Sequence, residues 1–219
     1  MSRIRNSNGI RTGFTLIELL VVIAIIGTLA ALGAGAYFRV MSSQTLKRSE
    51  ATIKKIHTGL ASQWTAAIDD VNNEVKNAKM TGTGDTAKIT YMTDRLTKEF
   101  PMTISEGVAK YPTLASAGSP PPDIANAICL YLALSKTRRG AIFNADDVGP
   151  SSTKEYGSFK YFVDAWGSPI KLVRWVTNPT TLTDLTQQPF LLSAGPDKVF
   201  GTNDDIRGDF MLKEGQRGN

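Results

Sequence analysis

Twenty consecutive residues without a charge, Leu19 to Phe38, constrain this chain more than any other feature. As an α-helix at ~1.5 Å per residue the run is about 30 Å long, the thickness of the hydrocarbon core of a bilayer. The chain as a whole has an ordinary globular composition, with 42% hydrophobic and 21% charged residues over 219 positions. The sequence therefore predicts one membrane span joined to one water-exposed domain, and it is too apolar for a disordered protein.

The segment that precedes the span is basic. Met1 to Gly13 carries Arg3, Arg5 and Arg11 and no acid, which is typical of a segment kept on the cytoplasmic side of a membrane. The whole chain has a net charge of +5, so the part after Gly13 keeps +2, because 5 − 3 = 2. This small excess does not favour a nucleic-acid partner.

The junction between leader and span carries a specific motif. It reads Gly13-Phe14-Thr15-Leu16-Ile17-Glu18 and continues without a charge through Gly27. This stretch resembles the class III signal of type IV pilins and type II secretion pseudopilins. The resemblance implies that a prepilin peptidase cuts after Gly13 and methylates the new amino terminus of Phe14. It also implies that Glu18 is the assembly glutamate, paired with the amino terminus of a neighbouring subunit.

A physical argument for the role of Glu18 is independent of the resemblance. A carboxylate deep in a bilayer costs about 2.5–3.5 kcal/mol, so an acid at the edge of the span needs a compensating cation. The new ammonium group of Phe14 could be that cation. An ordinary secretory signal is the alternative, since Ala34-Gly35-Ala36 is a possible cleavage site before Tyr37. Its apolar region, however, would exceed the usual ~7–15 residues and would contain an unexplained acid.

The apolar pattern becomes periodic after Arg39. Apolar residues then recur at steps of three, four and seven: Leu46, Ile53, Ile56, Leu60, Trp64, Ile68, Val71 and Val75. Such steps indicate one face of an α-helix, and no proline occurs before Pro101. We expect one helix from Phe14 to about Met80, with Trp64 in the core and His57 partly exposed beside the stripe.

These patterns predict an α+β protein with a pilin fold, in which a long helix packs on a small C-terminal antiparallel sheet. The expected division of the chain is a cleaved leader (1–13), a transmembrane part of the helix (14–38), an amphipathic part (39–80) and a periplasmic head (81–219).

A second helix is expected after the proline cluster Ser119 to Pro122. Asp123 is its expected N-cap, and the helix should end near Lys136 to Gly140, where cations complement the helix dipole. Cys129 falls within it and should be a buried small hydrophobe, so no disulfide within the chain can form. The cations Lys136, Arg138 and Arg139 could instead form a basic patch, but no aromatic residues interleave with them as in single-strand-binding sites.

The C-terminal region contains a second recognisable stretch. Asp164-Ala165-Trp166-Gly167-Ser168-Pro169 precedes an alternating strand pattern, and further strands are expected at Phe190 to Ser193 and Asp209 to Leu212. The stretch resembles the Asp-x-Trp-Gly-x-Pro sequence of type II secretion major pseudopilins. In that family a Ser-x-Gly-x-Asp loop follows, and residues 193–206 stand in its place here.

The resemblance implies that this acidic loop binds calcium, which replaces the disulfide of many type IV pilins. Calcium takes about 6–8 oxygen ligands, and an Asp- and Gly-rich loop can supply them. Asp197, Asp204 and Asp205 are the predicted side-chain ligands, with Ser193 and Ile206 contributing a hydroxyl or carbonyl oxygen. Without the resemblance, a loop rich in Asp, Gly and Asn is more typical of a solvated turn than of a calcium site.

Three functions compete at this stage. The first is a type II secretion pseudopilin, anchored once in the inner membrane with its head in the periplasm, whose partners are copies of itself in a helical filament, other pseudopilins and the prepilin peptidase. The second is a type IV pilin for adhesion, motility or DNA uptake. The third, an enzyme, is disfavoured because the chain has one histidine and no Gly-x-Ser-x-Gly, His-Glu-x-x-His or P-loop motif.

Overall fold

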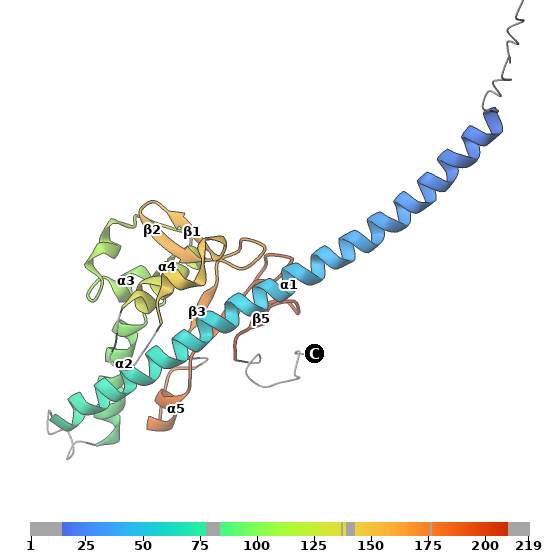
Figure 1. Cartoon of the computed structure of the whole chain (residues 1–219). Helices are drawn as coiled ribbons and strands as arrows, with labels where there is room; N and C mark the ends of the chain where they lie inside the picture. The colour runs from blue at the N-terminus through green and yellow to red at the C-terminus, as the bar shows by residue number, and fades with distance from the viewer. Residues whose placement is uncertain (1–14, 78–83, 137, 139–142, 176, 210–219) are drawn as a thin grey trace, which may run out of the picture. The chain divides into compact units, whose positions relative to one another are not determined.

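The computed structural model describes residues 15–77, 84–136, 138, 143–175 and 177–209. The chain divides into two compact units, residues 1–44 and 45–219. The predicted α+β class is confirmed: one long amino-terminal helix is followed by short helices and small antiparallel sheets (Figure 1).

The long helix α1 runs without interruption from Leu16 to Asn77. Within the first unit its large apolar side chains are exposed, with Leu16 82% and Leu32 74% accessible. This helix is long and apolar enough to cross a membrane, and none of the residues in its most apolar window is buried. The expected helix from Phe14 to Met80 agrees with α1 over the residues that the structure describes.

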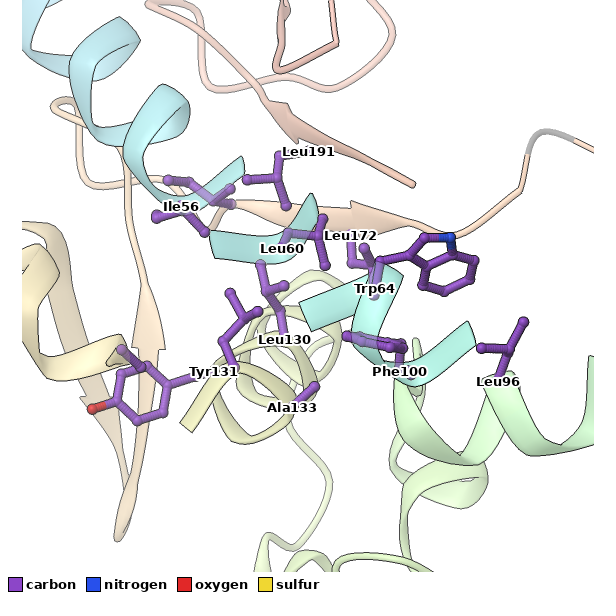
Figure 2. Packing of buried hydrophobic residues seen from close by; sticks show 14 of the residues in the cluster. Ile56, Leu60, Trp64, Leu96, Phe100, Leu130, Tyr131, Ala133, Leu172 and Leu191 are labelled. Atoms are coloured by element: carbon purple, nitrogen blue, oxygen red, sulfur yellow. The ribbon is translucent and has the colours of Figure 1, made fainter. Parts of the chain in front are cut away.

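The part of α1 in the second unit buries one stripe, as its periodicity predicts. Ile53, Ile56, Leu60 and Trp64 are each at most 1% exposed. Figure 2 shows three of these side chains gathered with Leu172 and Leu191 of the sheet and Leu130 of another helix. Trp64 also contacts the ring of Phe100, with 5.1 Å between centroids. The stripe is therefore the centre of the head's core.

Short elements complete the head. The helices are α2 Asp85–Glu99, α3 Ile104–Gly107, α4 Pro122–Ser135 and α5 Leu182–Thr186, with 3-10 turns η2 Pro112–Ser116, η3 Ala145–Val148 and η4 Pro150–Ser152. The strands are β1 Thr153–Tyr156, β2 Phe159–Phe162, β3 Lys171–Val173, β4 Phe190–Ser193 and β5 Ile206–Arg207. β1 and β2 form an antiparallel hairpin, and β3, β4 and β5 form a second antiparallel sheet in that order.

Helix α4 is buried on two sides and joins the layers of the head. Leu130 and Leu134 contact the α1 core, whereas Ala127 and Ile128 pack in a second cluster with Phe159 of β2. Its buried Asn126 accepts a hydrogen bond from the Leu172 amide (2.7 Å) and donates one to the Leu172 carbonyl (3.1 Å). These two bonds attach α4 to the free edge of β3, opposite the edge that pairs with β4, and they satisfy the Leu172 amide and carbonyl there.

Several local expectations are wrong. The N-cap of α4 is Pro121, not Asp123, because the helix begins two residues earlier than expected, with Pro122 at its first position, where proline needs no amide partner. Asp123 instead pairs with Lys171 at 2.9 Å. The last strand of the described residues is β5, which ends at Arg207. Asp209 follows in a turn, and the rest of the expected strand lies outside the described residues.

His57 is also placed differently from the expectation. It is 1% exposed, not partly exposed, because its ring packs beside Gly208, which follows β5. Burial lowers its pKa below the usual 6.5, so the neutral ring is the form that the core favours. Cys129 is fully buried and Trp64 lies in the core, and both of these predictions are confirmed.

A buried charge cluster joins three helical segments of the head. Glu99, at the end of α2, receives hydrogen bonds from Lys110 and from Arg138, the latter at 2.8 Å. Arg138 is 6% exposed and also donates to Gln63 of α1 (2.8 Å) and to the Ala133 carbonyl of α4 (2.9 Å). Arg138 thus lies in the interior as a partner of Glu99, so it is not part of a surface patch, whereas its bond to a carbonyl in the last turn of α4 agrees with the expected role of a cation at the helix end.

This cluster predicts acid sensitivity. Burial raises the pKa of Glu99, but the hydrogen bonds from Lys110 and Arg138 outweigh it and hold the pKa at about 2 instead of 4.5. The stabilisation is therefore complete above pH 4.5 and disappears as the pH falls toward 2. Its size is about 3 kcal/mol. We expect Glu99→Gln to lower the free energy of unfolding by about that amount and to flatten its pH dependence in this range, measured by denaturation with tryptophan fluorescence.

Asp94→Asn is the matched control on α2. Asp94 pairs with Lys98 at 2.7 Å, but both side chains are more than 40% exposed. Such a pair contributes less than about 1 kcal/mol. Equal losses for the two variants would contradict the assigned role of the buried cluster.

Candidate functional site

Glu18 lies in the first turn of α1, and its carboxylate is held by Thr15. Glu18 Oε2 accepts hydrogen bonds from the Thr15 amide and from Thr15 Oγ1, both at 2.8 Å. The Glu18 amide donates in turn to Thr15 Oγ1 at 3.3 Å. This reciprocal exchange is a capping box, which satisfies amides that a helix start leaves free. The processing residues Gly13 and Phe14 lie outside the described residues.

The capping box holds the carboxylate on Thr15, the residue that follows Phe14 in sequence. Thr15 directly follows Phe14, so a cut after Gly13 would leave the new ammonium group one residue from the group that Glu18 contacts. The positive end of the helix dipole also favours a carboxylate there. Glu18 is the only charged residue of Thr15 to Phe38. A cation brought to this point by another chain would therefore meet a single carboxylate.

The Asp-x-Trp-Gly-x-Pro stretch is a turn that joins the two sheets. Asp164 Oδ1 accepts hydrogen bonds from the amides of Trp166 (3.0 Å) and Ser168 (2.8 Å). The Asp164 amide donates to the Ser168 carbonyl at 2.9 Å, which closes the turn. Gly167 has φ +84°, a conformation that favours glycine.

Asp164 also fixes the start of the acidic loop. Its second oxygen, Oδ2, accepts a hydrogen bond from Ser193 Oγ at 2.7 Å, and both residues are at most 2% exposed. Ser193 Oγ in turn accepts from the Gly195 amide at 3.3 Å. Sequence reasoning quoted Asp164 only as part of a motif and missed this role. An aspartate followed three residues later by glycine is a turn signal. It could have indicated that Asp164 closes the turn, but not that it binds Ser193.

The carboxylates of the acidic loop, residues 193–206, accept hydrogen bonds from the loop itself. Asp204 accepts from Thr202 Oγ1 (2.6 Å) and from the Asp197 amide (3.1 Å), and these bonds lower its pKa. Asp197 Oδ1 accepts from the Val199 amide, and Asp205 Oδ2 from the Gly201 amide. Asp205 Oδ1 is buried and has no partner among the described residues.

The two ends of the loop meet closely. Gly195 has φ +65°, and a Cβ at this position would clash with the carbonyl oxygen of Asp204. Ser193 and Ile206 pair across the β4–β5 ladder, so they close the loop at its base. On the outer side, Lys171 lies over the ring of Phe200, 3.4 Å from the centroid. The loop is therefore a defined structure in this chain.

The structure brings some predicted metal ligands together and not others. Asp197 and Asp204 are joined by the amide-to-carboxylate bond, and Asp205 is next in sequence. Ser193 instead directs its hydroxyl to Asp164. Across the described part of the chain, no group of three or more His, Cys, Asp or Glu side chains is arranged to hold a metal ion.

Comparison with known proteins identifies the amino-terminal region. Residues 10–34 match the model of the family described as the prokaryotic N-terminal methylation motif. The match contains Gly13, Phe14 and Glu18. No curated protein and no solved structure matches the chain. The chain therefore carries a type IV pilin-like prepilin signal, the substrate of a prepilin peptidase, at the start of an unbroken helix that can anchor it in a membrane.

The Asp164 contacts predict a strong effect of one substitution in the head. Asp164→Ala would leave two amides and the Ser193 hydroxyl without their acceptor, which costs about 3 kcal/mol in total. We expect a corresponding loss in the free energy of unfolding, measured by chemical denaturation. Glu155→Ala, at an exposed position on β1, is the control and should change it by less than about 0.5 kcal/mol. Equal stability of both variants would contradict the role given to Asp164.

Proposed function

We propose that the chain is a structural subunit of a type II secretion pseudopilus. The prepilin peptidase cuts after Gly13, and the mature chain is held once in the inner membrane with its head in the periplasm. It then joins a helical filament with copies of itself and with other pseudopilins, and the filament drives protein secretion. The observation that carries the proposal is the methylation motif at residues 10–34, fused directly to α1.

The exposed apolar half of α1 supports assembly as well as anchoring. Large apolar residues on every side of Leu16 to Leu32 are exposed in the single chain. Such a surface needs lipid or the helices of neighbouring copies around it. Thr28, a polar residue within it, donates its hydroxyl to the Ile25 carbonyl at 2.9 Å, so it does not oppose burial in either environment.

The head favours a pseudopilin over a type IV pilin. The chain has one cysteine, Cys129, and it is buried in α4, so no disulfide pins the C-terminal region. The acidic loop, anchored through Ser193 to Asp164, would take the place of such a disulfide. A pilin role would show as loss of surface pili, motility or DNA uptake on deletion of the gene. The pseudopilin role predicts loss of secreted proteins instead.

Glu18 provides the sharpest test of assembly. In a filament its carboxylate would neutralise the amino terminus of a neighbouring Phe14, and Glu18→Ala would leave that ammonium group unpaired in apolar surroundings at a cost of about 2.5–3.5 kcal/mol. We expect normal cleavage after Gly13 but at least a tenfold smaller fraction of the chain in sheared filaments. Glu155→Ala is the control and should assemble normally. Full assembly of the Glu18→Ala chain would contradict the proposal.

Calcium in the acidic loop is the second part of the proposal. Asp197, Asp204 and Asp205 would supply carboxylate oxygens, with Ser193 and Ile206 contributing a hydroxyl or carbonyl oxygen. The buried, unpartnered Asp205 Oδ1 and the close approach of the loop's two ends support it. A hard cation such as calcium takes several oxygens of these kinds, and its charge would stabilise an acidic loop.

Removal of calcium tests this part directly. At a calcium concentration of 100 Kd, binding to the folded chain alone would stabilise it by about 2.7 kcal/mol. We expect the thermal midpoint to fall on chelation, and to be independent of calcium in Asp204→Ala. Asp147→Ala, an exposed acid outside the loop, should keep the response. An identical midpoint with calcium and with chelator would contradict calcium binding.

A further inference from the structure

Three cations converge on one carboxylate in the buried charge cluster of the head. Lys110 donates to Glu99 Oε1, Arg138 donates to Oε2 at 2.8 Å, and Lys136 Nζ lies 3.6 Å from the same Oε2. Among the described residues, Glu99 is the acid in every ion pair that these three cations form. The cluster therefore has more positive side chains than its single carboxylate can neutralise.

Arg138 closes the inner side of this cluster. One terminal nitrogen of its guanidinium donates to Gln63 Oε1 and to the Ala133 carbonyl. The other donates to the carboxylate of Glu99 and to its backbone carbonyl, the latter at 3.3 Å. The guanidinium also lies over the ring of Phe100, 4.6 Å from the centroid. Both terminal nitrogens are thus engaged in the interior, and the charge of Arg138 neutralises Glu99.

The two lysines form the outer side of the cluster and keep free donors. The side chains of Lys110 and Lys136 are 26% and 39% exposed, against 10% for Glu99. Each ammonium group has three N–H donors, and Lys110 uses one of them on Glu99. Lys136 Nζ, at 3.6 Å from its oxygen, is too distant for a hydrogen bond and has no other acceptor in the part of the chain that the structure describes. All but one of these N–H donors therefore remain for solvent or for a ligand.

The positions of the two lysines are unfavourable without a counter-ion. Burial and the neighbouring ammonium of Lys110 lower the pKa of Lys136. Two helix ends offset part of the excess, since α2 ends at Glu99 and Lys136 directly follows α4. Each end contributes about half a negative charge, so about one positive charge is left uncompensated at the outer side.

We propose that Lys110 and Lys136 together bind an oxyanion, a phosphate or a carboxylate, whose oxygens accept the N–H donors that the chain leaves open. Lysine ammonium groups are common point-charge partners of such groups. Glu99 and Arg138 are positioning residues, because they hold the two lysines together from the inner side. The site lies within the head, so the inference does not depend on the proposed function.

The first test measures the thermal midpoint of the full chain in detergent, with inorganic phosphate as the probe and chloride at equal ionic strength as the reference. At about ten times its Kd, an anion that binds only the folded chain should raise the midpoint by about 3–6 °C. Phosphate also stabilises proteins by exclusion from their surface, so the response is compared between variants. An equal midpoint in phosphate and in chloride would overturn the inference.

Lys136→Gln is the decisive variant, because this side chain makes no hydrogen bond within the described residues. In chloride we expect its midpoint to equal or exceed that of the unaltered chain, since a like-charge repulsion is removed. In phosphate it should lose most of the increase, and Lys136→Arg should retain it. Lys47→Gln removes an exposed lysine of α1 outside the cluster and should also retain it. A lower midpoint in chloride with an unchanged phosphate response would assign Lys136 to Glu99 alone and contradict the inference.

Two further probes distinguish the sources of the oxyanion. Acetate presents a free carboxylate, and a short oligoglutamate peptide presents the carboxylates of an acidic protein segment. A response to phosphate and acetate that exceeds the response to the peptide identifies a free anion as the ligand. A response to the peptide at a lower carboxylate concentration identifies an acidic protein partner. Either result supports the site if Lys136→Gln abolishes it, and a response that persists in that variant would contradict it.

Discussion

One helix in two environments is the constraint on which the rest of this structure depends. α1 is continuous from Leu16 to Asn77, but its apolar residues change from an all-round surface to a single stripe. The all-round part can be satisfied only by lipid or by other apolar helices, and the stripe only by a globular head. The processing signal, residues 10–34, overlaps the amino-terminal end of this helix. Anchoring, cleavage and assembly therefore converge on one element.

The head is organised around that helix by buried polar contacts as much as by the core. Arg138 and Glu99 connect α1, α2 and α4, and Asp164 connects the two sheets to the acidic loop through Ser193. Each of these groups is buried and each is paired, which is the condition under which buried charge is tolerated. A chain with one cysteine relies on such contacts to hold loops that a disulfide would otherwise fix.

The amino-acid pattern predicts the elements with a long periodic run of apolar residues. It misses short elements that are stabilised by contacts with segments distant in sequence. Continuous and then striped apolar residues predict α1, and β4 follows from Phe190 to Ser193 as expected. α2 was not predicted, although Ile89, Met92, Leu96 and Phe100 recur at steps of three and four, because this stripe is short and follows a segment rich in turn residues. The hairpin β1–β2 was missed because β1, Thr153–Tyr156, buries none of its side chains fully.

The same distinction applies to the candidate site. Gly13, Phe14 and Glu18 are recognisable from sequence because the motif is local, and the acidic loop is recognisable by its composition. Arg138 and its partner Glu99 are 39 positions apart in sequence, and Ser193 and its partner Asp164 are 29 positions apart. No local pattern encodes such contacts, since each depends on how the helices and sheets pack.

The mass of the mature chain isolated from membranes tests the central claim most directly. Cleavage after Gly13 predicts a mature chain that begins with a singly methylated Phe14. A chain that keeps Met1, or one that begins at Tyr37 after an ordinary signal peptidase cut, would contradict the account.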